Sequence, residues 1–159
     1  MIPGHTRTLT LEAEKADVYY SGQCAEFCGL SHANMRFAVL SKEPAEFETW
    51  LEEQAQPAAA PPGDAAAGAE LFEEETCVAC HAIGGVEGAE ARVGPNLTHF
   101  AQRKQFAGYM IENDITGDAA NVSAWLKDPQ AVKPGAQMPN LGLSDDEVAN
   151  LVAYLRTLE

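Results

Sequence analysis

The sequence has little of what would place it among membrane-spanning or nucleic-acid-binding proteins. No apolar run approaches the roughly 20 residues that cross a bilayer as a helix, and the opening MIPGHTRTLT has neither the basic nor the apolar part of a signal peptide. Basic residues are scarce: 10 Lys and Arg stand against 24 Asp and Glu, for a net charge of -14. Because phosphate binding needs clustered basic residues, we expect no nucleic-acid partner. An acidic surface either steers a basic partner or keeps the protein soluble, and charge alone does not decide between these roles.

Cysteine is also scarce, and its placement is informative. The four cysteines form two close pairs, Cys24 with Cys28 and Cys77 with Cys80. Disulfides within such pairs would close only very short loops and would add little stability. The pairs therefore indicate metal ligands or cofactor anchors.

A stretch of low complexity divides the chain in two. QAQPAAAPPGDAAAG, residues 54–68, consists almost entirely of Ala, Pro and Gly and has no large apolar residue. Such a composition is typical of a semi-extended linker. We therefore expect a first domain over 1–55, a linker over 56–67 and a second domain over 68–159.

The first segment is expected to be mostly β-structure. Three short runs alternate in polarity or are rich in β-forming residues, and these are Thr8–Glu12, Val18–Tyr20 and Arg36–Leu40. The turn residues Ser21 and Gly22 follow the second run. Phe47, Trp50 and Leu51 then recur at the spacing of a short amphipathic helix. So few strands cannot close a barrel, so the segment resembles the C-terminal part of a larger β domain.

The second segment is expected to be helical. Its helix candidates are Ala69–Glu75, Phe100–Asn113, Asn121–Asp128 with Pro129 stopping it, and a final helix. Ser144 and Glu147 form the capping-box pattern at the start of that final helix. Its apolar stripe is Val148, Leu151, Val152 and Leu155.

The pattern Cys77-Val78-Ala79-Cys80-His81 is C-x-x-C-H, the attachment signature of c-type haem. Two thiols at this spacing can each bond one vinyl group of a porphyrin, and the next residue then presents its imidazole to the iron. A zinc site or a redox dithiol is the alternative, but neither needs the adjoining histidine. The motif therefore predicts a covalently bound haem.

Met138 is the preferred candidate for the sixth iron ligand. It lies in the Pro- and Gly-rich loop KPGAQMPN just before the final helix, where it cannot belong to a helical core stripe. Met110 and His99 are the competing candidates. Ligation by His and Met leaves no open position on the iron, which suits electron transfer rather than oxygen binding.

Together with GPNL at residues 94–97, these motifs make residues 69–159 resemble a small class I cytochrome c. The resemblance implies an all-α fold. It also implies that the Pro95 carbonyl accepts the hydrogen bond from the second ring nitrogen of His81, as metal-bound imidazoles usually require.

A second constellation lies in GQCAEFCGLSHANM, residues 22–35. Cys24, Cys28, His32 and Met35 follow one another at intervals of four, four and three. Thiolate and thioether ligands favour copper over zinc. From spacing alone, a three-ligand zinc loop or a disulfide stays open.

This stretch resembles the copper loop of cytochrome c oxidase subunit II. The resemblance implies a binuclear CuA centre bridged by Cys24 and Cys28, with His32, a weakly bound Met35 and the backbone carbonyl of Glu26 as further ligands. It also implies that the Glu26 carboxylate reaches a magnesium ion at the interface with the catalytic subunit. The family's first histidine ligand has no counterpart, since His5 does not stand at its position.

The combined resemblance implies an electron-transfer subunit of a respiratory terminal oxidase. Electrons would pass from the haem to CuA and on to subunit I, where oxygen is reduced. The implied partners are subunit I, other oxidase subunits, and a donor such as a cytochrome c or a quinol-oxidising complex. In nitrous oxide reductase an aromatic residue stands where Glu26 stands here, so Glu26 favours the oxidase over that enzyme. A nitric oxide reductase subunit, a free mono-haem cytochrome with a remnant segment, and a copper-transfer protein stay as alternatives.

The resemblance also bears on location. Haem is attached to C-x-x-C-H outside the bacterial cytoplasm, which predicts the periplasmic or outer face of the membrane. Because the transmembrane hairpin and most strands of the oxidase subunit have no counterpart, we expect Met1 to be an internal methionine of a fragment or of a mis-started reading frame. Membrane contact would then come through the upstream segment, and copper binding by the chain alone would be weak or absent.

Overall fold

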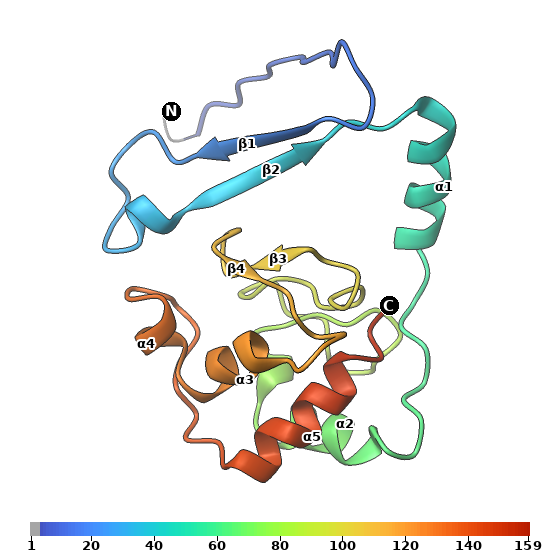
Figure 1. The fold of residues 1–159 in the computed structure, drawn as a ribbon, viewed down its shortest axis with the longest axis vertical. Coiled ribbons are helices and arrows are strands. Elements are labelled where there is room, and N and C mark those ends of the chain that lie inside the picture. Colours follow the sequence, from blue (N-terminus) through green and yellow to red (C-terminus); the bar gives the residue numbers. More distant parts are fainter. Residues whose placement is uncertain (1–3) are drawn as a thin grey trace.

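The structure is a computed structural model that describes residues 4–159; the prediction about Met1 lies outside these residues. A two-stranded hairpin and helix α1 lie at one end of the molecule, and the helices of the second part lie at the other (Figure 1). Among the described residues, no helix has the length and apolar character that a membrane crossing requires.

Two of the three strands predicted in the first part are present. Strand β1 (Tyr19–Gln23) pairs antiparallel with β2 (Arg36–Leu40), and Tyr19 lies opposite Leu40. The turn predicted at Ser21 and Gly22 is wrong, because both residues lie inside β1.

The strand predicted over Thr8–Glu12 is also wrong, since this segment has no regular structure. Leu9 is 80% and Leu11 79% exposed. A strand requires a partner for its backbone hydrogen bonds, and the described residues place none beside this segment. The segment has the alternating polarity of a strand, but none of the described strands pairs with it.

Helix α1 (Pro44–Gln54) confirms the prediction of a short amphipathic helix. Its first residue is a proline, which is favourable at that position because the backbone N–H there has no helical partner. Phe47 and Trp50 stack with ring centroids 5.7 Å apart, yet both remain partly exposed.

The second part is built around two crossing helices, α2 (Ala66–Glu74) and α5 (Asp145–Leu155). Phe72 and Tyr154 meet edge to face at 5.7 Å where they cross. Gly68 lets the backbones approach so closely that a Cβ there would lie 2.0 Å from the carbonyl oxygen of Asn150.

The prediction for the last helix is confirmed in detail. Ser144 caps α5, and the reciprocal hydrogen bonds of a capping box with Glu147 are both present. The predicted stripe is buried, and its members are Val148, Leu151, Val152 and Leu155.

Two short helices connect this core to the loop that carries Met138. Helix α3 (Ala120–Lys127) confirms the prediction for that region. Pro129 ends α3, as expected, and also begins the one-turn helix α4 (Pro129–Val132). Asp128 accepts backbone hydrogen bonds at the start of α4.

The helix predicted over Phe100–Asn113 is wrong. The segment contains the short antiparallel pair β3 (Gln105–Phe106) and β4 (Ile111–Glu112), joined by residues with positive φ, Ala107 at 51° and Tyr109 at 57°. A helix cannot include these left-handed conformations. The regular structure of the second part is therefore helical, apart from this one short strand pair.

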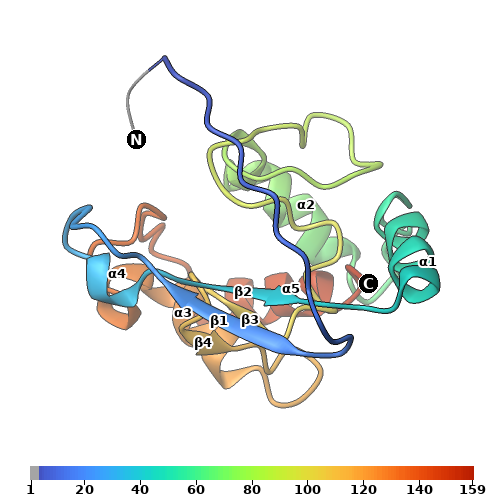
Figure 2. The same ribbon diagram turned by 90° about the horizontal axis from the view of Figure 1, so that it is seen from above.

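The two parts contact each other directly. The Ser31 hydroxyl donates to the Pro134 carbonyl at 2.6 Å, and the Arg36 N–H donates to the Gly108 carbonyl at 3.1 Å. Seen from above, the β1–β2 hairpin overlies α3, β3 and β4 (Figure 2). The Ala- and Pro-rich stretch between the parts packs against the second part, where Ala58 N–H donates to the Gly84 carbonyl at 2.8 Å.

Candidate metal centres

The C-x-x-C-H motif forms a compact turn directly after α2. Thr76 adopts a left-handed conformation (φ 60°) that ends α2, and the 3-10 helix η2 (Cys77–Ala79) follows. The His81 N–H donates to the Cys77 carbonyl at 2.9 Å, and the Gly94 N–H donates to the Cys80 carbonyl at 2.7 Å. These bonds fix the two thiols and the imidazole on one short, rigid segment.

The orientation of the His81 ring is set by residues that follow the motif. Its Nδ1 lies 2.8 Å from the Pro95 carbonyl oxygen. A carbonyl only accepts, so Nδ1 carries the proton and Nε2 keeps the lone pair that an iron ion needs. Gly94 lies against the ring, since a Cβ there would be 2.6 Å from His81 Cε1. This geometry supports the predicted roles of His81 and Pro95.

A cavity of about 1110 Å³ opens beside this turn, and both predicted iron ligands, His81 and Met138, line it. Cofactor sites usually measure about 300–1,000 Å³. Cys80 and Trp125 also contribute to the lining. An imidazole and a thioether in one large cavity, next to a thiol pair, are the donor set that a c-type haem requires. The residues present fit the cofactor.

Neighbouring side chains donate hydrogen bonds to the loop that carries Met138. The Trp125 indole N–H donates to Met138 Sδ at 3.1 Å, and Gln130 Nε2 donates to the Met138 carbonyl at 3.1 Å. Of the competing ligands, Met110 does not line the cavity, whereas His99 does. His99 Nδ1 lies 2.8 Å from the Glu159 carbonyl oxygen.

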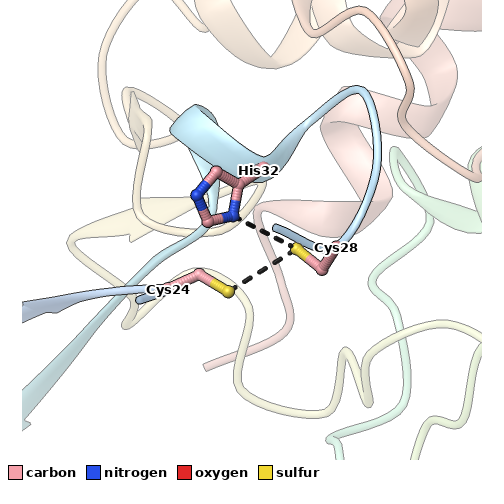
Figure 3. Close-up of side chains that lie close together, drawn as sticks. All are labelled: Cys24, Cys28 and His32. Carbon is pink, nitrogen blue, oxygen red and sulfur yellow. Dashed lines mark hydrogen bonds between the residues drawn. The ribbon is translucent and has the colours of Figure 1, made fainter. Parts of the chain in front are cut away.

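The predicted copper ligands also gather in one place, at the loop between β1 and β2 (Figure 3). The Cys24 and Cys28 sulfurs are 3.5 Å apart, and Cys28 Sγ lies 3.7 Å from His32 Nδ1. The two cysteines are free thiols, so the disulfide alternative is not realised. The ligand atoms of these three residues all lie within 4.8 Å of one another, as a metal site requires.

Two further donors surround the thiols. Met35 Sδ lies 3.8 Å from Cys28 Sγ, and the Glu26 carbonyl lies 3.2 Å from Cys24 Sγ. The hydrogen bond with Cys24 is the main cause that raises the pKa of the Cys28 thiol, and desolvation raises it further. Sulfur, imidazole and carbonyl donors together suit copper. His5 does not belong to this group among the described residues, so a second histidine ligand is lacking there.

Comparison with known families decides the identity of the second part. The family model described as cytochrome c matches residues 65–159. The chain belongs to the cytochrome c family. The model described as cytochrome c oxidase subunit II, periplasmic domain, matches residues 1–42. The two resemblances drawn from the sequence are thus confirmed.

Relatives carry the same combination of parts. "Cytochrome c oxidase subunit 2" of Alkalihalophilus pseudofirmus is 39% identical over 160 residues, which are 99% of this chain and 44% of that protein. The protein of the same name from Bacillus subtilis is 39% identical over 151 residues, 92% of this chain and 41% of that protein. The chain therefore spans less than half the length of these relatives.

The cytochrome c domain alone also has relatives. Cytochrome c of Tetrahymena pyriformis is 36% identical over 101 residues, 62% of this chain and 92% of that protein. Among solved structures, cytochrome cH from Methylobacterium extorquens is 32% identical, with a TM-score of 0.44, and the match covers 60% of this chain and 99% of that one.

Two features of the cytochrome c domain's cavity escaped the sequence analysis. Trp125 reads as an ordinary core residue of an amphipathic helix, and only the fold brings its N–H to Met138. Arg36 and Lys42 line the cavity although they belong to the first part of the chain. Arg36 and Lys42 are six residues apart, and in an extended segment an even spacing puts both side chains on the same face. This spacing was the signal that the sequence offered.

Proposed function

We propose that the chain is an electron-transfer subunit of a respiratory terminal oxidase, passing electrons from covalently bound haem c to a CuA centre and on to subunit I. The observation that carries this proposal is the cavity beside Cys80 that His81 and Met138 both line. The copper loop in direct contact with the cytochrome c domain supports the second half of the proposal.

In the cytochrome c domain, Cys77 and Cys80 would hold the haem covalently, and His81 and Met138 would be the ligands of its iron. When bound, the haem supplies a one-electron couple at an iron with no free coordination position. The protein orients His81 through Pro95 and holds the Met138 loop through Trp125. Rigid placement of both ligand side chains would limit their rearrangement when the iron changes oxidation state, and this favours fast electron transfer.

In the copper loop, the thiols of Cys24 and Cys28 would hold the copper of a CuA centre, with His32, Met35 and the Glu26 carbonyl as further ligands. The chain supplies one histidine to this site, so we expect weak copper binding by these residues alone. The Glu26 carboxylate is a candidate ligand of a magnesium ion at the contact with subunit I.

The covalent link between the two parts makes their encounter intramolecular. A short tether gives an effective concentration far above that of a freely diffusing donor. The hydrogen bonds from Ser31 and Arg36 to the cytochrome c domain then fix which surfaces meet. We place the assembled subunit at the outer face of the bacterial membrane, with oxidase subunits and an upstream electron donor as partners.

Expression in a bacterial strain competent in cytochrome maturation tests the proposal. We expect a red protein whose denatured chain keeps the mass of one haem, and a colourless protein from the Cys77→Ala/Cys80→Ala variant. Cys24→Ser/Cys28→Ser is the matched control, because it removes two thiols and should leave the haem in place. A wild-type chain without covalent haem would refute the proposal.

Copper binding is tested separately on the same haem-loaded chain. Titration with copper should produce thiolate-to-copper absorption that the Cys24→Ser/Cys28→Ser variant lacks. If wild type and variant respond identically, the copper half of the proposed function is wrong and the haem half stands.

A further inference from the structure

The charges around the haem cavity are distributed in a way that the chain's composition does not predict. Five of the ten basic residues of this acidic chain line the cavity, and not one of its 24 acidic residues does. The five are Arg36, Lys42, Arg103, Lys104 and Lys133. The cavity is thus a strongly cationic site in an anionic protein.

Two of these cations come from the first part of the chain, across the contact between the parts. In a strand, every second side chain points to the same face. Arg36, Ala38 and Leu40 of β2 line the cavity at this spacing, as does Lys42 two residues beyond the strand. Phe37 also contributes to the lining, whereas Val39 does not. The Arg36 N–H bonded to the Gly108 carbonyl holds this end of β2 over the cytochrome c domain.

Within the described part of the chain, these cations form no ion pair with an acidic side chain. The ion pair found among residues 4–159 joins Lys127 and Asp145, outside the cavity. Lys133 donates to the Ala107 carbonyl at 2.8 Å and Arg103 to the Asn96 carbonyl. Burial lowers the pKa of both Lys133 and Arg103, because desolvation disfavours their charged forms. Partly desolvated positive charges that line one cavity without carboxylates are stabilised by an anionic occupant.

We propose that Arg36 and Lys42 pair with the carboxylate side chains of the haem, so that the occupied cavity holds β2 and the copper loop against the cytochrome c domain. This inference rests on the haem function proposed above. A haem carries two carboxylates on one edge, and carboxylates leaving water need charged hydrogen-bond donors. The cytochrome c domain's own cations, Arg103, Lys104 and Lys133, line the same cavity, so both parts contribute charge to one cofactor.

The pairing adds an ionic contact to the hydrogen bond between Ser31 and Pro134 and makes docking of the parts depend on the haem. It also ties the reduction potential to docking. Positive charge near the iron disfavours the oxidised state, so losing the β2 cations lowers the potential of the haem.

The test uses the full chain, loaded with haem and free of copper. Arg36→Gln/Lys42→Gln removes both charges, Arg36→Lys/Lys42→Arg keeps them, and Arg36→Glu/Lys42→Glu reverses them. The control is Arg7→Gln/Lys15→Gln, which removes two exposed cations of the same part that lie outside the cavity. The reduction potential and the amide hydrogen exchange of Arg36–Leu40 are measured for each protein.

We expect the potential to follow charge: unchanged in the charge-keeping variant and the control, lower in the Gln variant, and lowest in the Glu variant. Exchange of the β2 amides should be between about threefold and tenfold faster in the Gln variant, the range expected from losing two partly exposed ion pairs. A haem-loaded Gln variant that matches the control in both measurements overturns this inference and leaves the proposed function intact. A wild-type chain that acquires no haem overturns both.

Discussion

Substitution of Gly68 tests the close crossing of α2 and α5 in the cytochrome c domain. An alanine Cβ at this position would lie 2.0 Å from the Asn150 carbonyl oxygen and 2.8 Å from Tyr154 Cβ, so α2 and α5 must move apart. Overpacking of this kind costs about 1–3 kcal/mol, and we expect the upper end because the contact is with helix backbone rather than with a mobile side chain. The better helix propensity of alanine offsets up to about 1 kcal/mol.

We therefore expect Gly68→Ala to lower the free energy of unfolding by about 2 kcal/mol, which for a domain of this size lowers Tm by roughly 8–16 °C. Thermal unfolding of the haem-loaded chain, followed by far-ultraviolet circular dichroism, measures this. Gly63→Ala is the matched control, since nothing lies within 4 Å of its added Cβ. Equal Tm values for the two variants would refute the close crossing of α2 and α5.

Three further changes probe other parts of the account. Trp125→Phe removes the N–H whose nitrogen lies 3.1 Å from Met138 Sδ. Because the thioether then donates more strongly to ferric iron, the reduction potential of the haem, measured by redox titration, should fall by roughly 20–60 mV. Leu151→Ala, at a side chain 1% exposed, should cost about 3 kcal/mol in denaturant unfolding. Hydrogen bonds from Ser144 lower the pKa of the Glu147 carboxyl, so their stabilisation is present above the unfolded pKa of Glu and is lost as pH falls through the lower folded pKa. The deficit of Ser144→Ala in Tm should therefore be largest at neutral pH and shrink in acid, and a deficit independent of pH would contradict this.

The parts of the fold that the sequence predicted are those set by neighbouring residues. The capping box at Ser144 and the stripe of α5 depend on a few positions along one helix, and both were correct. C-x-x-C-H is likewise local, since one turn brings Cys77, Cys80 and His81 together.

The wrong predictions concern segments whose structure depends on distant partners. Thr8–Glu12 has the alternation of a strand, but residues 4–159 offer it no neighbouring strand to bond. In the 100–113 segment, apolar spacing resembled a helix, but Phe100 and Phe106 are buried as an edge-to-face pair at 5.9 Å, and Asn113 Nδ2 donates to the Phe100 carbonyl. These tertiary contacts outweigh helix propensity, which is a weak preference.

The site could be predicted only in its list of ligands. The contacts of Trp125 with Met138 and of Ser31 with Pro134 join segments that are 13 and 103 residues apart. The cationic lining combines residues of both parts of the chain, and the net charge of -14 gives no hint of it. Three-dimensional proximity was needed to find it.

Addition of carbon monoxide to the reduced, haem-loaded chain tests the central claim most directly. If His81 and Met138 close both sides of the iron, the absorption spectrum of the wild-type protein stays unchanged, whereas Met138→Ala opens one side and gives the spectrum of a carbon monoxide complex. Ready binding of carbon monoxide by the wild-type chain would contradict the account, because the haem would then have an open coordination position.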